Sequence, residues 1–372
     1  MKIIPKIQKY KKKIFSKYAK GLFNLKHLSN TKKLILFFVP AETDNISGGI
    51  LSICTIFKEV SLLKKIHNAN VVSSFIPNLH KVDYTYSMFK NEMVIFNFSE
   101  IMERFTKLES LEVHIPDYML PIFNKENPNM DLFCDWSKCI KYFKINILNQ
   151  NDLLMPDLIH INNLRNICSN LSMTVAHEKY ATLEKRIFYE MPLHLFSPWL
   201  TPTPYIKKTF FQKENIIVLS PDEIDRVPTG TKLSKIEIEE KLKKNLPEFE
   251  FITIQNMRYD TYKETISRAK FTITFGEGLD GYFIESIFSG SISFAVYNEL
   301  FFKPNFKNLP TVYSSYDELF NIIISDIKKY DSNQKDYVSY NNELINIATE
   351  IYSYRRLKEN VKQYYLGNID FK

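Results

Sequence analysis

The stretch GEGLDGYFIESIFSGSISFA, residues 276–295, decides the fold of this chain. The residues just before it, KFTITF, predict a short buried strand, and SISFAVY at residues 291–297 predicts another. Between these strands, a glycine-rich turn leads into a predicted helix from about Tyr282 to Phe288. A strand, a loop, a helix and a second strand in this order are typical of α/β proteins with a parallel sheet.

The glycine-rich loop predicts a site for an anion beside hydroxyl groups. A helix that begins directly after such a loop presents free N–H groups and the positive end of its dipole, so a negative group is favoured in front of it. Glu277 lies in the loop and Glu285 in the helix, and carboxylates accept hydrogen bonds from hydroxyl groups. Phosphate and sugar hydroxyls occur together in nucleotide sugars, so the pattern indicates this class of ligand.

The spacing of the two glutamates resembles a known motif. Retaining glycosyltransferases of the GT-B fold carry two glutamates separated by seven residues, in a pattern that runs roughly E-G-x-G-x-x-x-x-E-A-x-x-x-G-x-P-V-V-A. The matching positions here are Glu277, Gly278, Glu285, Gly290 and Ala295, with Ser286 for the usual alanine and Ile292 for the usual proline. The resemblance implies that Glu285 binds the ribose hydroxyls and that Glu277 contacts the transferred sugar. It also implies that the backbone at the helix start faces the donor sugar and its phosphate, at Gly278, Leu279, Asp280, Gly281 and Tyr282.

The same residues also form the dinucleotide-binding fingerprint G-x-G-x-x-G, with Gly276, Gly278 and Gly281, and Glu299 follows near the end of the next strand. An enzyme that uses an NAD(P)-type cofactor is therefore the first alternative. A glutamate inside the loop would repel a pyrophosphate, and the fingerprint normally opens a domain rather than lying three quarters along a chain. The nucleotide-sugar hypothesis is favoured for these reasons. The simplest alternative is a tight turn with two solvated glutamates.

A second loop with glycines lies near the start of the chain. LILFFV, residues 34–39, is continuously apolar and predicts a strand buried on both faces. A loop then leads to Ser47, Gly48 and Gly49, where a predicted helix begins. This unit resembles the opening unit of GT-B enzymes, in which glycines let the backbone approach the ligands. Gly48 and Gly49 are therefore expected to bind the donor.

The domain organisation follows from the length and from one proline-rich segment. A chain of 372 residues predicts two domains of ordinary size. MPLHLFSPWLTPTPY, at residues 191–205, predicts an extended connector, and strands alternate with helices on both sides of it. We expect a basic amphipathic segment at 1–30, an N-terminal Rossmann-like acceptor domain at 31–200, a C-terminal Rossmann-like donor domain at 206–345, and a helix at 346–372 that could pack back on the first domain. The expected fold is α/β of the GT-B type, with its two Rossmann-like domains facing each other across a cleft.

Two histidines stand near the ends of predicted strands, where side chains in parallel sheets tend to face the ligand crevice. His177 follows the uncharged residues 172–176 and precedes a predicted helix. Related enzymes often place a polar residue or a histidine of the N-terminal domain beside the donor sugar. His177 is therefore a candidate catalytic residue together with Glu277, and His114 is a weaker candidate.

The resemblance breaks down at the diphosphate clamp. Related retaining enzymes carry a Gly-Arg pair after the first strand of the second domain and a Lys-Gly pair some residues later, whereas ENIIVLS is followed here by PDEIDRVPTGTKLSK. Arg226 and Lys232 are the nearest candidates for donor binding, and Lys235 is the third. Arg258 and Tyr262 are candidates for a place near the nucleobase.

Composition and charge indicate a soluble, peripheral protein. Apolar residues make up 45% of the chain and charged residues 24%, which is a globular composition, and no segment approaches 18 uncharged apolar residues. The four cysteines, at 54, 134, 139 and 168, have no zinc or disulfide spacing. We find no cleavable signal peptide and expect a cytoplasmic setting.

The basic charge is concentrated at the N-terminus. Residues 1–30 carry nine lysines and no acid, and since the whole chain is +7, the other 342 residues together carry −2. Ile7, Tyr10, Ile14, Tyr18 and Leu22 recur at helical spacing opposite the lysines. This pattern suits an anionic membrane surface, at the inner face of the cytoplasmic membrane, better than nucleic acid. An ordinary first helix is the alternative.

The sequence as a whole favours a glycosyltransferase. No metal is expected, because the chain has no D-x-D pair and no cluster with ligand spacing, and no cofactor is expected beside the nucleoside-diphosphate sugar substrate. We expect a retaining enzyme that transfers a hexose or deoxyhexose to a polysaccharide or lipid-linked glycan, such as a capsule or lipopolysaccharide precursor of a bacterial surface. A catalytically inactive GT-B-like scaffold is the non-enzyme alternative, which the missing clamp allows.

Overall fold

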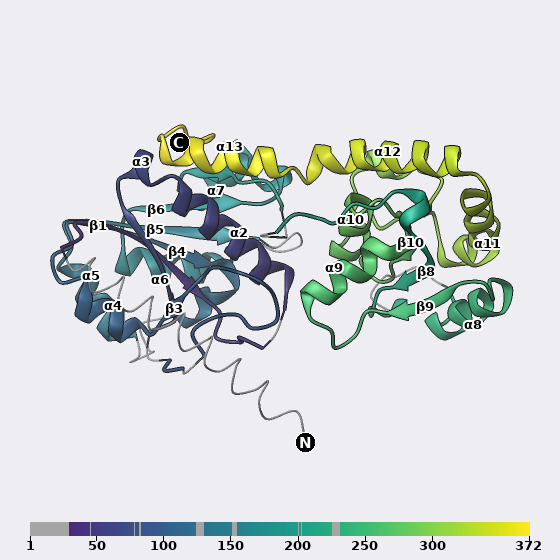
Figure 1. Cartoon of the computed structure of the whole chain (residues 1–372). Helices are drawn as coiled ribbons and strands as arrows, with labels where there is room; N and C mark the ends of the chain where they lie inside the picture. Colours follow the sequence, from purple (N-terminus) through teal and green to yellow (C-terminus); the bar gives the residue numbers. More distant parts are fainter. Residues whose placement is uncertain are drawn as a thin grey trace, which may run out of the picture. The chain divides into compact units, whose positions relative to one another are not determined.

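The computed structural model describes residues 30–44, 46–77, 79–81, 83–123, 130–150, 155–199, 201, 203–224 and 231–372. They form two compact units. Unit 1 holds the described residues before Thr203 together with Tyr354–Lys372, and unit 2 holds Thr203–Ser353 (Figure 1). Except for Asn30, the expected basic segment at 1–30 lies outside the described residues.

Unit 1 contains a parallel sheet whose described strands have the order β3-β2-β1-β4-β5-β6-β7. In the middle of this sheet, every residue from Leu34 to Val39 is at most 2% exposed, as the continuous apolar run predicts for a strand covered on both faces. The strands are β1 (Lys33–Val39), β2 (Asn70–Phe75), β3 (Ile95–Phe96), β4 (Ser110–Pro116), β5 (Tyr142–Asn149), β6 (Leu171–Val175) and β7 (Leu193–Leu195). The helices are α2 (Gly48–Leu62), α3 (Lys64–His67), α4 (Phe98–Arg104), η1 (Asp117–Ile122), α5 (Asp131–Lys138), α6 (Leu158–Ile167), η3 (Glu178–Tyr180), α7 (Leu183–Tyr189) and α13 (Tyr354–Tyr365).

Unit 2 contains a second parallel sheet, with the order β12-β11-β10-β8-β9. Its strands are β8 (Glu214–Leu219), β9 (Glu250–Thr253), β10 (Ala269–Ile273), β11 (Ile292–Val296) and β12 (Val312–Tyr313). Its helices are η4 (Phe210–Gln212), α8 (Lys235–Asn245), α9 (Tyr259–Arg268), α10 (Gly281–Phe288), η6 (Pro304–Phe306), α11 (Tyr316–Ser332) and α12 (Gln334–Ile351). Both strand orders are those of doubly wound α/β units, so each unit is Rossmann-like, as the sequence predicts.

Three features differ from the sequence expectations. The segment expected to be only a connector contains β7, because Leu193, His194 and Leu195 pair with β6 and are all buried. The expected boundary at residue 346 falls inside α12, which runs to Ile351, and the chain returns to unit 1 only at Tyr354. The strand β12 was not expected, since two residues are too short for a hydrophobic period to be recognised.

The C-terminal segment completes unit 1. The helix α13 lies against α2 and β7, and Phe371 pairs with Leu193 through two backbone hydrogen bonds of 2.9 and 3.0 Å. Beneath α13, the Tyr364 hydroxyl donates to Glu112 Oε1 at 2.6 Å and accepts from Lys144 Nζ at 2.6 Å. The contacts of Lys144 and Tyr364 hold the pKa of the Glu112 carboxyl below its usual range, although burial opposes them. The charged pair is therefore stabilised by the tyrosine that α13 supplies.

Replacing Tyr364 by phenylalanine should destabilise unit 1. The change removes a hydroxyl that hydrogen-bonds to two charged groups, so we expect a loss of about 1–3 kcal/mol in the free energy of unfolding. Both tryptophans, Trp136 and Trp199, belong to unit 1, so urea unfolding followed by tryptophan fluorescence reports on this unit. Tyr142→Phe, at a mostly exposed tyrosine of the same unit, is the matched control. An unchanged midpoint for Tyr364→Phe would contradict the assigned role.

Candidate functional site

The predicted nucleotide-sugar loop lies at the switch point of the unit 2 sheet. From β8 the chain goes first to β9 on one side of it and then to β10 on the other, so the strand order reverses between β8 and β10. In open α/β sheets, ligands bind at such a point, outside the carboxyl ends of the strands. The residues that follow the two strands are joined there, because Phe275 N–H donates to Ser220 Oγ at 3.0 Å. The topology therefore selects the edge at which the loop of residues 274–280 begins.

Two glycines give the loop its shape. Gly276 and Gly278 have φ values of 68° and 75°, in the left-handed region that side chains rarely adopt. The space at Gly278 is also closed, because a Cβ atom there would lie 2.7 Å from Val296 O and 2.7 Å from Phe302 Cε2. Gly276 N–H donates to the Tyr316 hydroxyl at 3.0 Å. The loop thus needs glycine at Gly278 for both its backbone and its packing.

The start of α10 is only partly open to a ligand. Asp280 is the N-cap, and its Oδ1 accepts from Phe283 N–H at 2.9 Å. Leu279 N–H donates to the carbonyl of Glu277 at 2.9 Å, and the Leu279 side chain is buried in the core. Gly278 N–H also donates within this region, to the carbonyl of Phe275 at 3.4 Å, so the backbone donors of Gly278 and Leu279 are already used. Gly281 and Tyr282 are the first two residues of α10, at the positive end of its dipole.

Glu285 lies in the interior of unit 2, between α10 and α9. It is 3% exposed, and its Oε2 accepts from the Tyr259 hydroxyl at 2.5 Å. Burial raises the pKa of the Glu285 carboxyl from 4.5 to about 7, although the Tyr259 hydrogen bond and the charge of Lys263 act in the opposite direction. Glu277, by contrast, is half-buried in the loop. The two glutamates therefore differ in environment, and the charge state of Glu285 changes near neutral pH.

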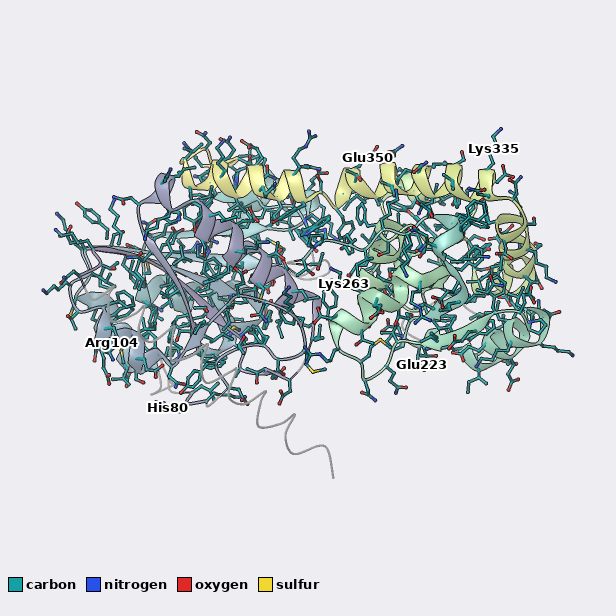
Figure 2. The ribbon with its side chains drawn as sticks, viewed as in Figure 1. His80, Arg104, Glu223, Lys263, Lys335 and Glu350 are labelled. Atoms are coloured by element: carbon teal, nitrogen blue, oxygen red, sulfur yellow. The ribbon has the colours of Figure 1, made fainter. Side chains whose placement is uncertain are left out.

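Lys263 joins this cluster to the beginning of unit 2. It is 5% exposed, and its Nζ donates to Thr203 O at 3.1 Å, to Thr203 Oγ1 at 2.7 Å and to the carbonyl of Pro204. Figure 2 labels its side chain. The Tyr205 ring lies 5.4 Å from the same ammonium group and stacks on Phe288 of α10. The connector, α9 and α10 are thus held together around Glu285.

The basic residues expected at this edge are placed differently from one another. Arg226 lies outside the described residues, and Lys232 is exposed on the surface. Lys235, the third candidate, is 7% exposed at the start of α8, where its Nζ donates to Ser220 O at 2.9 Å and lies 5.2 Å from the centre of the Phe275 ring. Among the basic residues considered from the sequence, Lys235 is the one that the structure brings to the residues flanking the loop.

The Ser47 loop occupies the corresponding position in unit 1. It follows β1, beside which the strand order reverses toward β4. Ser47 is the N-cap of α2 and its Oγ accepts from Ile50 N–H at 3.2 Å, while Gly48 and Gly49 are the first two helical residues. A Cβ atom at Gly49 would make only an ordinary contact of 3.5 Å, with Gln150 Oε1. The helix therefore begins at the residues predicted from the sequence.

The two histidines considered from the sequence have different surroundings. His177 follows β6 at the carboxyl edge of the unit 1 sheet, where its carbonyl accepts from Tyr180 N–H at 3.0 Å. His114 is inside β4 rather than at its end, is fully buried, and stacks on Phe37. Burial lowers the pKa of His114 to about 4, so it is neutral at physiological pH. The expectation that His114 faces a ligand crevice is therefore wrong, and His177 stays a prediction.

Several polar residues near the loop were not singled out in the sequence. Tyr259, Lys263 and Tyr316 contact Glu285, the connector and Gly276, respectively. Lys263 and Tyr259 fall on one side of the predicted helix YDTYKETISRA, but nothing in the sequence shows that this side faces Glu285. The contact of Tyr259 depends on the packing of α9 against α10, because it joins residues 26 positions apart in the sequence.

The glycine fingerprint is not in the position that a dinucleotide site requires. In that class of fold the fingerprint lies in the first turn between strand and helix. Here it follows β10, the third strand of unit 2 in chain order, and Glu277 lies inside it. This placement favours the nucleotide-sugar hypothesis over the cofactor alternative.

Two other features, a metal cluster and a membrane-spanning helix, are absent from the described residues. No group of three or more His, Cys, Asp or Glu side chains in this part of the chain is arranged to hold a metal ion. Over the same residues, none of the helices has both the length and the apolar character that crossing a membrane requires.

No protein-family model and no curated protein matches this chain. Among solved structures, it is similar to Anabaena Alr3699/HepE in complex with UDP-glucose, with a TM-score of 0.49 and 9% identity, over 89% of this chain and 98% of that one. It is also similar to UDP-GlcNAc 2-epimerase from Neisseria meningitidis bound to UDP-GlcNAc, with a TM-score of 0.47 and 11% identity, over 91% and 100% of the two chains. For Medicago truncatula UGT71G1 complexed with UDP-glucose, the TM-score is 0.45 and the identity 9%, over 91% and 98%. Because these TM-scores lie below 0.5, the fold assignment rests on the two sheets of this chain.

Proposed function

We propose that this protein is a glycosyltransferase of the GT-B type, which moves a sugar from a nucleoside-diphosphate sugar to a polysaccharide or lipid-linked glycan. One observation carries the proposal: a helix start and the two glutamates Glu277 and Glu285 belong to one loop-helix unit at the switch point of a doubly wound sheet. Phosphate suits the helix start, and hydroxyl groups suit the carboxylates. A nucleotide sugar supplies both.

The donor would be held by groups of unit 2. The start of α10, at Gly281 and Tyr282, faces the phosphates, and Lys235 supplies positive charge beside the loop in place of the clamp that the sequence lacks. Glu285 accepts the ribose hydroxyls, and Glu277 contacts the transferred sugar. Because the Glu285 carboxylate is buried, a ligand must either displace the Tyr259 hydroxyl or bind to the carboxylate beside it.

The transfer needs no group that becomes covalently bound to the sugar. In a retaining reaction of this kind, the bond between the anomeric carbon and the phosphate oxygen breaks, and the acceptor oxygen bonds to the same face of the sugar. The acceptor proton passes to the leaving phosphate oxygen, so neither a protein nucleophile nor a metal ion is required in this mechanism. The loop at Ser47, Gly48 and Gly49 and the side chain of His177 are proposed to contribute from unit 1.

Thermal stabilisation by ligands tests the proposed function. We expect UDP-glucose, UDP-GlcNAc or another nucleotide sugar, and the matching nucleoside diphosphate, to raise the melting temperature, whereas NAD does not. A free ligand concentration of 100 times the dissociation constant adds about 2.7 kcal/mol to the free energy of unfolding. For a chain of this size, this gain gives a clear rise in the melting temperature. Stabilisation by NAD alone would favour the cofactor alternative and exclude this proposal.

An inactive protein of the same fold would behave differently in an assay of nucleotide release. It would bind the nucleoside diphosphate but would release no nucleotide in the presence of donor and acceptor. Release of nucleoside diphosphate, measured with cell-surface glycan fractions as acceptors, therefore separates the enzyme from the scaffold. The absence of a Gly-Arg and a Lys-Gly pair after β8 is the observation that keeps the scaffold as the second candidate.

Residues 1–30 are proposed to bind an anionic membrane surface. Nine lysines without an acid contribute on the order of 1 kcal/mol each near anionic headgroups. Deleting residues 1–30 should release the protein from vesicles that contain phosphatidylglycerol, and tryptophan fluorescence should show that unit 1 stays folded. Sedimentation with vesicles of neutral lipid is the control. Equal binding of the full chain and the deletion variant would rule this proposal out.

A further inference from the structure

Two buried polar atoms beside the α10 helix have no hydrogen-bond partner among the described residues: the hydroxyl of Tyr262 and Oδ2 of Asp280. Tyr262 is 5% exposed on α9, and Asp280 is the N-cap of α10. A buried polar atom without a partner costs free energy of the order of 1–3 kcal/mol, so such atoms need an explanation. Neither atom takes part in the contacts already assigned to the loop.

The ring of Tyr262 is held in place on two sides. It meets the Tyr282 ring edge-on, with the ring centres 5.7 Å apart, and its centre is also 5.7 Å from that of Tyr259. Tyr282 is the second residue of α10 and Tyr259 the first of α9. The unpaired hydroxyl is therefore fixed between the beginnings of the two helices, beside the carboxylate site of Glu285.

The charges around the two atoms limit the kind of group that can bind them. Burial raises the pKa of the Tyr262 hydroxyl well above its ordinary value, and the charges of Glu285 and Asp280 act in the same direction, so the hydroxyl keeps its proton. Burial also raises the pKa of Asp280. The backbone N–H groups of Phe283 and Tyr282 oppose this rise, and the charges of Asp222 and Glu277 add to it. The acidic groups disfavour a phosphate against these two side-chain atoms, and the proposed place of the phosphates is the backbone of Gly281 and Tyr282.

A hydroxyl group of a ligand has the chemistry that each of the two atoms lacks. It can accept a hydrogen bond from the Tyr262 O–H, and a hydroxyl group can donate to Asp280 Oδ2 when that carboxyl is ionised or accept from it when it is protonated. The motif that this stretch resembles has glycine where Asp280 stands, so the side chain is an addition of this chain. In a nucleotide sugar, hydroxyl groups occur on the ribose and on the transferred sugar.

We propose that Tyr262 and Asp280 bind a hydroxyl group of the nucleotide sugar and thereby contribute to the choice of donor. This inference rests on the proposed function, because it gives the side chains of two residues already expected near the donor a specific role in binding it. We therefore expect that removing either side-chain group weakens the binding of only those ligands that carry this hydroxyl group.

Calorimetric titration of Tyr262→Phe and Asp280→Asn with UDP-glucose, UDP and 2′,3′-dideoxy-UDP tests the proposal. Phenylalanine keeps the ring packing, and asparagine keeps the cap of α10. We expect each variant to bind UDP-glucose about tenfold more weakly, which is the effect of one hydrogen bond. Tyr330→Phe and Asp336→Asn, on α11 and α12, are the matched controls and should bind like the wild type.

The three ligands identify the hydroxyl. Weaker binding of UDP-glucose and UDP with unchanged binding of dideoxy-UDP assigns it to the ribose, and weaker binding of UDP-glucose alone assigns it to the transferred sugar. Unchanged affinity for all three ligands, or an equal loss for all three, would overturn the inference while leaving nucleotide binding intact. If the wild type bound none of the ligands, the proposed function would fall, and this inference with it.

Discussion

Replacing Glu285 by glutamine is expected to weaken the binding of UDP-glucose about 100-fold at pH 8. The carboxylate is proposed to accept two ribose hydroxyls, and a hydrogen bond to a charged group contributes about 1.5–3 kcal/mol. Glutamine has nearly the same size and can still accept from the Tyr259 hydroxyl, so the packing between α9 and α10 should be kept. Calorimetric titration measures the change. Glu264→Gln makes the same chemical change on the exposed side of α9 and should leave the affinity unaltered.

The pH dependence gives this prediction a second, independent measurement. UDP-glucose has no phosphate that titrates between pH 6 and 8, whereas the pKa of Glu285 is about 7 in the folded protein. Because only the ionised carboxylate is a pure acceptor, the affinity of the wild type should rise from pH 6 to pH 8. The affinity of Glu285→Gln should not change with pH over this range. A pH-independent affinity of the wild type would contradict the role of Glu285.

The same carboxyl should make unit 2 less stable as the pH rises. Its pKa is raised from 4.5 to about 7, so the folded state holds the proton more tightly than the unfolded state. The contribution of this carboxyl to the free energy of unfolding is about 3 kcal/mol. It is fully present below pH 4.5 and is lost as the pH rises through 7. Glu285→Gln should remove this loss and exceed the wild type in stability above pH 7. Urea unfolding followed by circular dichroism at pH 5 and pH 8 provides the comparison.

Replacing Gly278 by alanine should have the largest effect on the structure of the loop. The new Cβ would lie 2.7 Å from the backbone oxygen of Val296, which cannot rotate away, and the residue would also have to adopt a φ of 75°. The left-handed conformation alone costs about 1–2 kcal/mol, and the steric conflict adds to it, so we expect a destabilisation of about 3 kcal/mol or more. The loop should shift, and nucleotide binding should be lost with it.

Gly367→Ala isolates the part of the effect that comes from the backbone. Gly367 has a φ of 80°, but a Cβ there would meet no atom within 4 Å, so only the conformational cost of about 1–2 kcal/mol applies. Circular dichroism follows urea unfolding of both variants, and thermal stabilisation by UDP-glucose reports on the loop. Equal destabilisation by the two substitutions would show that the packing around Gly278 is looser than the structure indicates.

The sequence predicted the strands near the two loops because local patterns determine them. The continuous apolar run at residues 34–39 and the glycine-rich stretch after KFTITF gave the correct elements, and Ser47 does cap the helix that follows. The helix α11 is capped in the same way, because Ser315 Oγ accepts from Glu318 N–H at 3.1 Å. Short strands such as β12 have too few residues to produce a pattern.

The surroundings of the site could not be derived from the sequence, because they depend on contacts between distant residues. Glu285 was expected to face a ligand directly, and the structure places its carboxylate under Tyr259 with Lys263 nearby. Lys235 ranked below Arg226 and Lys232, yet it contacts the residues beside the loop, because α8 begins next to the end of β8. No periodicity predicts which helix faces cover a given carboxylate.

Hydrogen-deuterium exchange with saturating UDP-glucose shows which part of the protein a nucleotide sugar protects. We expect slower exchange at residues 275–283 and at the start of α9, with a smaller change in Glu285→Gln at the same ligand concentration. Slower exchange confined to unit 1, or ligand binding without any change at residues 275–283, would contradict the proposed donor site.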